Sequence, residues 1–252
     1  MSNLVDSHAH LDLCGDPAAA VSESLEHGVS RILAVGFDME TSRKAVALAK
    51  AHPQVLASVG IHPHDATSVD DAALAELSRL AAEPEVVAIG ETGLDFFRDR
   101  SPRDSQMEAF LRHIELARET GLTLMVHSRE APQETLATLE EHSAGLRVVI
   151  HCFSLYDHVQ ECAGHRYFMS VAGNVTFPKA TELRDAATRI PDDLLLTETD
   201  SPWLAPVPHR GKPNSPANIR FILEELALLR RIPVAALARQ VSANFETAFG
   251  LA

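Results

Sequence analysis

Short apolar runs alternate with longer amphipathic segments along nearly the whole chain, and this alternation constrains the fold more than any other feature. The runs are apolar on both faces, as expected for buried parallel strands. They predict strands at 4–8, 31–36, 55–60, 86–90, 123–127, 147–151, 167–171 and 194–199. Helices are predicted at 17–27, 40–51, 70–82, 103–120, 131–142, 155–163, 179–189, 215–230 and 234–249. This order predicts an α/β fold, a single (β/α)8 TIM barrel that takes up residues 1–252 as one domain.

The composition is consistent with a barrel that folds without disulfide bonds or other cross-links. Apolar residues make up 46% of the chain, enough for a large core. The three cysteines form no Cys-x-x-Cys pair and are expected to be reduced thiols. The first residues lack the basic and long apolar segments of a secretory leader, and no run approaches the roughly 20 apolar residues that span a bilayer. We therefore expect a soluble, cytoplasmic protein without a membrane partner.

The charge balance limits how the protein can hold a polyanion. The formal net charge is −13, and the basic residues include only four lysines. Such a surface does not attract nucleic acid by its overall field. Any polyanionic substrate is expected to be held locally, by metal ions or by a few arginines.

Polar side chains stand at the carboxyl ends of the predicted strands, where barrels of this kind build their active sites. His8 and His10 are two residues apart, so in a strand they project to the same face. The other members of this ring are Glu91, His127, His151 and Asp200. Nitrogen and oxygen ligands suit ions such as Zn²⁺ and Mn²⁺. Six ligands exceed one tetrahedral site, which favours two metal ions bridged by a carboxylate.

A single histidine at a strand end is more often a hydrogen-bonded polar residue than a ligand. The coincidence of four histidines and two carboxylates with the ends of five predicted strands is what favours a metal centre. Six further histidines on or beside the predicted helices are expected to be solvated. They are His27, His52, His113, His142, His158 and His165. Cys152, beside His151, is expected to point away from the barrel interior and to serve packing.

The ordered motifs resemble those of the TatD family of metal-dependent deoxyribonucleases, within the amidohydrolase superfamily. The matching stretches are 6–11, 60–64, 90–95, 127–131, 151–154 and 198–204, followed by Arg210-Gly211 and Asn214. They run in the family's order over nearly the whole chain. A His-x-His pair alone would be weak evidence, whereas the ordered set is specific.

The resemblance implies roles for particular residues. His8, His10 and Asp200 would hold one metal ion, His127 and His151 the other, and Glu91 would bridge them. Asp200 would also take the proton from the attacking water. The side chains expected to face the substrate are His62, His64, Arg129 and Arg210. The ions implied are two divalent metals per chain, Zn²⁺, Mg²⁺ or Mn²⁺.

Two departures from the family's pattern concern the substrate more than the metals. Leu155 stands where the family often has glycine, and Phe96 and Phe97 follow Gly-Leu-Asp where the family often has tyrosine. The second change removes a hydroxyl contact. Trp203, the only tryptophan, lies in a predicted rim loop, where it either stacks on a base or packs the loop onto the barrel.

Three functions are consistent with these residues. The first is hydrolysis of phosphodiester bonds in DNA at single-stranded ends, by a water that two metals activate. The second keeps the site and changes the bond to an amide or ester of a small substrate or an aminoacyl-tRNA. The third, a barrel that only binds a partner, is disfavoured by the complete ligand set. Product analysis separates the first two.

Overall fold

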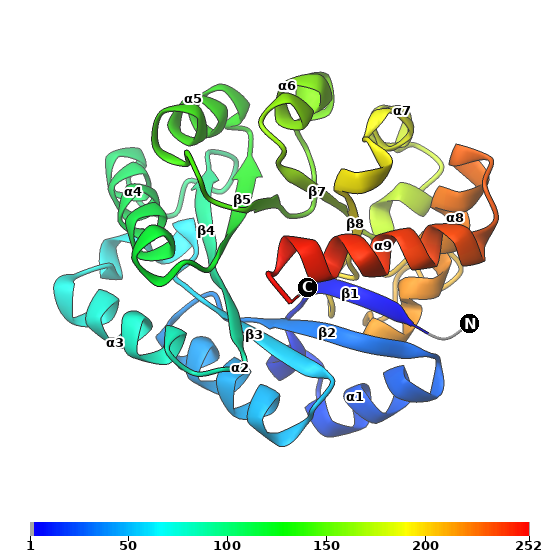
Figure 1. The fold of residues 1–252 in the computed structure, drawn as a ribbon, viewed down its shortest axis with the longest axis horizontal. Coiled ribbons are helices and arrows are strands. Elements are labelled where there is room, and N and C mark those ends of the chain that lie inside the picture. The colour runs from blue at the N-terminus through cyan, green and yellow to red at the C-terminus, as the bar shows by residue number, and fades with distance from the viewer. Residues whose placement is uncertain (1–2, 252) are drawn as a thin grey trace.

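The computed structural model describes residues 3–251 and forms one eight-stranded barrel surrounded by helices (Figure 1). The sheet order is β1 to β8, and every neighbouring pair from β1–β2 to β7–β8 is parallel. The strands are β1 (Leu4–Ala9), β2 (Val29–Val35), β3 (Val55–Val59), β4 (Val86–Asp95), β5 (Thr123–Arg129), β6 (Val148–Ile150), β7 (Phe168–Val171) and β8 (Leu195–Thr197). The predicted (β/α)8 TIM barrel is confirmed.

The helices follow the strands as predicted, with changed boundaries. They are α1 (Pro17–Glu26), α2 (Met39–Ala51), α3 (Asp71–Ala81), α4 (Arg103–Thr120), α5 (Pro132–His142), α6 (Val159–Gly164), α7 (Thr181–Arg189), α8 (Ile219–Arg230) and α9 (Val234–Ala248). The segments 155–158 and 215–218, predicted as helix, lie outside α6 and α8. Aspartate caps explain several starts, because the side chains of Asp16, Asp38 and Asp70 accept hydrogen bonds from first-turn N–H groups.

The barrel closes where β1 meets the segment after β8. Ala9 and Ser201 form a parallel bridge, and the His10 N–H donates to the Ser201 carbonyl at 2.8 Å. The Asp200 N–H donates to the His8 carbonyl at 3.0 Å. These bonds join the first strand to the segment after the last strand, so that His8 and His10 lie beside Asp200.

Strand β4 is longer than predicted, because it continues through Glu91 to Asp95 instead of ending at Gly90. Its pairing with β5 shifts register between Ile89 and Thr92, so the strand bulges at Glu91 and then pairs again. Gly93 makes this return possible. A Cβ at Gly93 would lie 2.0 Å from the His127 carbonyl oxygen, so only glycine lets the two backbones approach so closely.

Helix α9 closes the amino-terminal end of the barrel and crosses in front of it in Figure 1. The Ala248 carbonyl accepts a hydrogen bond from Thr123 at the start of β5. The Asn244 amide donates to the Leu195 carbonyl at the start of β8, at 2.8 Å. The carboxyl ends of the strands are therefore the open end. Among residues 3–251, no helix has both the length and the apolar composition that a bilayer crossing requires.

Candidate metal centre

Glu91 lies at the centre of the polar cluster in the open end of the barrel. Its side chain is buried, at 3% exposure, because the bulge in β4 directs it inward. Oε2 of Glu91 lies 3.5 Å from Nε2 of His8 and 3.6 Å from Nε2 of His10. Oε1 lies 2.8 Å from Nε2 of His151 and 2.9 Å from Nδ1 of His127. The two oxygens of one carboxylate thus face two separate pairs of imidazoles.

Asp200 faces the first of these pairs. Its Oδ1 lies 3.6 Å from Nε2 of His10 and 3.9 Å from Nε2 of His8. Asp200 has a positive φ of 54° and follows the end of β8, so the segment 198–200 is irregular where a strand to Thr199 was predicted. The structure therefore brings together all six side chains of the predicted ring.

His62 and His64 lie beside the same cluster. Nε2 of His62 is 3.4 Å from Oε1 of Glu91, and His62, Glu91 and His127 together could hold an ion. Nε2 of His64 points to Oδ2 of Asp95 at 2.8 Å. Burial lowers the pKa of His62 to about 4, which leaves its imidazole neutral near pH 7.

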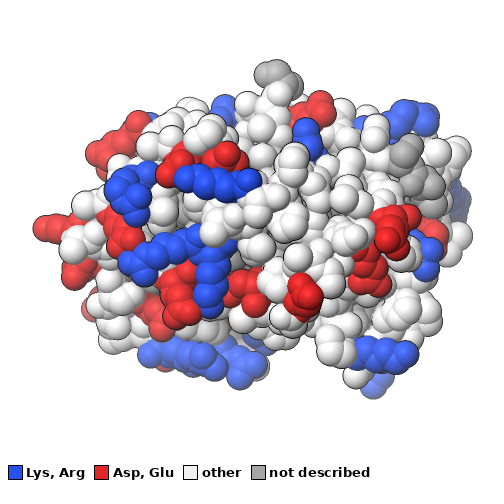
Figure 2. All heavy atoms as spheres, turned by 90° about the horizontal axis from the view of Figure 1, so that it is seen from below, with Lys and Arg blue, Asp and Glu red and all other residues white. Residues whose placement is uncertain are grey.

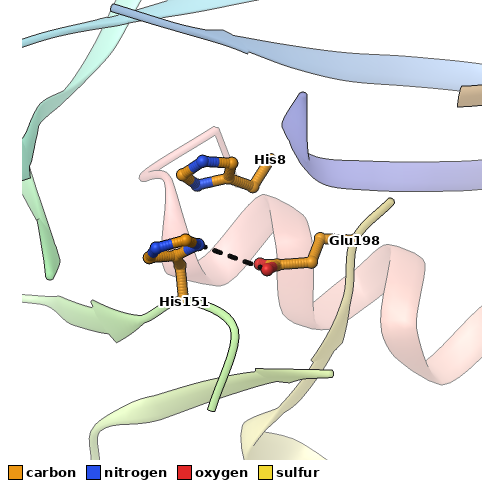
Figure 3. A group of neighbouring side chains, drawn as sticks. All are labelled: His8, His151 and Glu198. Atoms are coloured by element: carbon orange, nitrogen blue, oxygen red, sulfur yellow. Dashed lines mark hydrogen bonds and ion pairs between the residues drawn. The ribbon is translucent and has the colours of Figure 1, made fainter. Parts of the chain in front are cut away.

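Three carboxylates support the ring from behind. Glu198 is buried and its Oε1 lies 3.2 Å from Nδ1 of His151, which turns Nε2 of that ring toward Glu91 (Figure 3). Asp95 is buried, with Oδ2 at 3.5 Å from Nε2 of His127. Asp6 is buried and accepts hydrogen bonds from both N–H and Oγ1 of Thr199, and burial raises the pKa of its carboxyl to about 7. Such partners orient metal ligands.

None of these three residues was predicted from the sequence to have a role. Asp95 ends the Gly90–Asp95 motif and Asp6 begins the Asp6–Leu11 motif, so their places within the motifs were signals. Two other predictions were wrong. His113, expected to be solvated, is fully buried and accepts a hydrogen bond from the N–H of Ile61. Cys152 lies beyond the end of β6 with a φ of 42°, so strand alternation does not apply there, and it lines the open cavity.

The donor set fits divalent cations. Nε2 of His8 and Nε2 of His10 are 3.1 Å apart, and Nδ1 of His127 and Nε2 of His151 are 3.2 Å apart. Two nitrogens on one tetrahedral ion at metal–nitrogen distances of 2.0–2.1 Å would be separated by about 3.3 Å. Burial lowers the pKa of both His8 and His10, which keeps their nitrogen lone pairs free to bind a cation.

The two carboxyl groups, Glu91 and Asp200, differ in how strongly the site favours their charged form. Burial opposes ionisation of Glu91, but the neighbouring His151 and His62 hold the pKa of this carboxyl well below its usual range. For Asp200, burial together with repulsion from Glu198 and Glu91 raises the pKa well above its usual range, against the opposing effect of His151. A divalent cation between these groups would stabilise both carboxylates in their charged form.

The cluster forms the floor of a cavity of about 930 Å³. Arg129 and Trp203 line this cavity, and Trp203 is 49% exposed with its ring edge-on to His10 at 4.9 Å between centroids. Leu155 also lines it and is itself buried. Arg210 does not line it, because its guanidinium lies over the ring of Phe177, 4.4 Å from the centroid.

Comparison with known proteins places these features in one family. The profile of the TatD-related DNase family matches residues 5–250. An uncharacterized metal-dependent hydrolase, YcfH, of Escherichia coli K12 is 40% identical over 260 residues, covering 98% of this chain and 95% of its own. The 3'-5' ssDNA/RNA exonuclease TatD of the same strain is 34% identical over 239 residues and 92% of each chain. The crystal structure of YjjV, a TatD homologue from E. coli K12, superposes with a TM-score of 0.92 at 29% identity, covering 98% of both chains.

Fold, site and relatives define this chain as a metal-dependent hydrolase built on a (β/α)8 barrel. Within that class the chain belongs to the TatD-related DNase family. The resemblance drawn from the motifs is thereby confirmed.

Proposed function

We propose that this chain removes nucleotides from the 3′ ends of single-stranded nucleic acid by hydrolysing phosphodiester bonds with the help of two divalent ions. The proposal rests on the directions of the two carboxylate oxygens of Glu91. Its Oε2 faces His8 and His10, and its Oε1 faces His127 and His151. A carboxylate placed in this way suits two neighbouring cations. The exonuclease named among the relatives supports the choice of substrate.

The proposed ligands follow from these distances. His8, His10 and Asp200 would hold one ion, His127 and His151 the other, and Glu91 would lie between them. Bound divalent ions would supply an acidified water near neutral pH and would neutralise charge on the phosphate. Asp200 lines the cavity and is only 14% exposed, which suits it to accept a proton from the attacking water.

The remaining side chains would position the substrate. Arg129 would contact a phosphate, and Trp203, beside His10, would stack against the terminal base. His62 and His64 border the cavity on the β3 side. Because α9 closes the opposite end of the barrel, a chain terminus reaches this floor more easily than an internal segment does.

The test is product analysis. A 5′-labelled single-stranded oligonucleotide incubated with the protein and Mg²⁺ or Mn²⁺ should yield a ladder that shortens from its 3′ end, with mononucleotides released. Asp104→Asn, at an exposed aspartate on α4, is the matched control for Asp200→Asn and should retain activity. Failure to cleave any oligonucleotide, together with release of a free acid from an ester or amide, would refute the proposal.

A further inference from the structure

Strands β4 and β5 extend to the same height on one side of the mouth. Asp95 at the end of β4 pairs in register with Arg129 at the end of β5, and the N–H of Phe96 donates to the Arg129 carbonyl at 2.9 Å. The loop that follows β4 therefore begins directly beside Arg129. This arrangement depends on the continuation of β4 beyond the bulge at Glu91.

Asp95 also determines the shape of that loop. Its Oδ1 accepts hydrogen bonds from the N–H groups of Phe97 at 3.0 Å and Arg98 at 2.7 Å. The two adjacent phenylalanines then take different positions. Phe96 packs against the core with the guanidinium of Arg103 over its ring, 4.2 Å from the centroid. Phe97 faces outward and is 56% exposed.

Phe97 lies beside cationic groups rather than in isolation. The guanidinium carbon of Arg129 is 4.0 Å from the centroid of its ring, and that of Arg98 is 5.8 Å away. Much of the ring remains open to solvent despite these neighbours. Exposure of a phenylalanine of this size is unfavourable in water, so a ligand that covers it gains free energy.

The two exposed aromatic residues in the described part of the chain both lie at the mouth. Over residues 3–251 as a whole, the exposed large apolar side chains are Leu13, Leu25, Phe97, Trp203, Val207, Leu228 and Leu251. Trp203 follows β8 and Phe97 follows β4, so they stand on opposite sides of an eight-stranded barrel. Leu13 and Trp203 line the cavity, and Phe97 lies beside Arg129, which also lines it. Exposed apolar groups close to a cavity indicate a binding surface.

Positive charge is found on the Phe97 side of the cavity. The three arginines that line it are Arg98, Arg100 and Arg129, from the loop after β4 and the end of β5. Two exposed acidic residues, Asp65 and Glu130, line the cavity as well. On the opposite side the lining includes the apolar Leu13, Trp203 and Leu204 together with Asn174 and Asp200, and it holds no arginine. A polyanionic strand that leaves the metal centre is therefore drawn toward β4 and β5.

We propose that Phe97, Arg98 and Arg129 form a second nucleotide subsite, which we call the β4 shelf. The base upstream of the cleaved nucleotide stacks on Phe97, and Arg98 and Arg129 contact the phosphates on either side of it. This inference rests on the proposed nuclease function, for which the metal centre holds the terminal nucleotide. It makes the exit path of the strand specific, with Trp203 at the terminal base and Phe97 at a base further upstream.

Affinity measurements in an Asp200→Asn background test the shelf without cleavage. Fluorescently labelled single-stranded oligonucleotides would carry one abasic site at each of the four 3′-terminal positions in turn. Phe97→Ala should weaken binding of the intact oligonucleotide about 5- to 150-fold, the range expected for one lost base stack. The loss should disappear when the abasic site occupies the position that stacks on Phe97. Phe97→Trp should bind nearly as well as the parent, and Phe97→Leu should resemble Phe97→Ala.

Two controls separate the shelf from a general defect. Leu228→Ala removes an apolar side chain that is 71% exposed on α8, and it should leave both affinity and activity unchanged. In the otherwise unaltered enzyme, Phe97→Ala should reduce kcat/KM for the oligonucleotide more than for bis(p-nitrophenyl) phosphate, which is too short to reach the shelf. A loss of affinity that is the same at every abasic position would overturn the subsite.

The outcomes distinguish this inference from the proposed function. Cleavage and binding of oligonucleotides that do not respond to Phe97→Ala would reject the shelf and leave the nuclease function intact. No binding or cleavage of any oligonucleotide would reject both. A position-specific loss in Phe97→Ala, restored by Phe97→Trp, would support both.

Discussion

Oε1 of Glu198 lies 3.2 Å from Nδ1 of His151 and also accepts a hydrogen bond from the N–H of Cys152 at 2.8 Å. Glu198 is fully buried, and the ring of His151 stacks on that of His8 with 3.9 Å between centroids. Figure 3 shows the carboxylate directed at one edge of the His151 ring. Glu198 therefore determines which nitrogen of His151 faces Glu91, and together with His8 and His151 it also forms a group of side chains that could itself hold an ion.

Glu198→Gln should weaken metal binding about 10- to 100-fold, because an amide orients His151 less strongly and does not increase its basicity. Metal content after equilibrium dialysis against Zn²⁺ or Mn²⁺ measures this directly. Glu140→Gln, an exposed glutamate on α5, is the control and should bind metal normally. Unchanged metal content in Glu198→Gln would show that the contact does not support the ligand.

Asp200→Asn should lower kcat about 10²- to 10⁴-fold, since loss of a general base alone has effects of this size. The affinity for an oligonucleotide should change much less, because the arginines at the mouth remain in place. Steady-state kinetics combined with direct binding measurements would separate the two quantities. Near-normal turnover in the purified variant would remove Asp200 from the mechanism.

Chelation by EDTA should abolish hydrolysis, and added Mg²⁺ or Mn²⁺ should restore it, because the cluster around Glu91 needs cations to act. The fold should survive, since the barrel core consists of apolar strands and helices that do not contact the proposed ions. Circular dichroism before and after chelation measures this. An unfolded spectrum after chelation would contradict the claim that the core is independent of the metals.

His113 should make the stability of the protein fall in acid. Burial lowers its pKa to about 4, whereas in the unfolded chain it titrates near 6.5. Its neutral form therefore contributes stability that is complete above pH 6.5 and is lost as the pH falls toward 4. The loss is roughly 3 kcal/mol of the free energy of unfolding. Urea unfolding across this pH range measures it.

His113→Leu should flatten that acid dependence. It should also destabilise the protein at neutral pH by about 1–3 kcal/mol, because the N–H of Ile61 loses its acceptor. His165→Gln, at an exposed histidine, is the control and should keep the dependence on pH seen in the parent. An equally steep acid limb in His113→Leu would assign the effect to other groups.

Binding of single-stranded oligonucleotide should depend only weakly on salt. Basic side chains on α2 are paired with acidic ones on α3 or just after it, as in Arg43–Glu76 and Lys50–Glu83, both at 2.7 Å. Figure 2 shows blue and red groups side by side on this face, without a continuous basic track. Two or three phosphate contacts at the mouth predict a slope of log affinity against log salt of about −1.4 to −2.1. A much steeper slope would mean that further basic surface takes part.

The barrel could be predicted because its strands are short apolar runs repeated at a regular spacing, and this pattern survives in the sequence. The six side chains of the ring, Glu91 included, could be predicted for the same reason, since strand ends of a barrel converge at one face. A periodic pattern of apolar residues cannot predict local irregularities of the backbone. The bulge at Glu91 and the return of β4 to Asp95 depend on close backbone approach at Gly93.

The remaining differences arise from tertiary contacts. Alternation along an extended strand would give Glu198 and Asp200 the same orientation, but β8 ends at Thr197 and the two side chains reach different parts of the site. His113 was expected in solvent because it lies on a helix, yet it faces the loop that carries Ile61. Arg210 matched a family motif, and its position over Phe177 depends on a loop that no pattern describes.

Helix α9 closes one end of the barrel, so the active-site cavity has a single opening. If the protein is the proposed exonuclease, the substrate must enter and the product must leave through the same open end, and a strand cannot pass through the barrel. Each released mononucleotide has to leave past the strand from which it was cut, so product release and strand advance cannot occur independently. The pace of repeated cutting is thereby linked to how quickly the shortened strand loosens its hold and advances by one nucleotide.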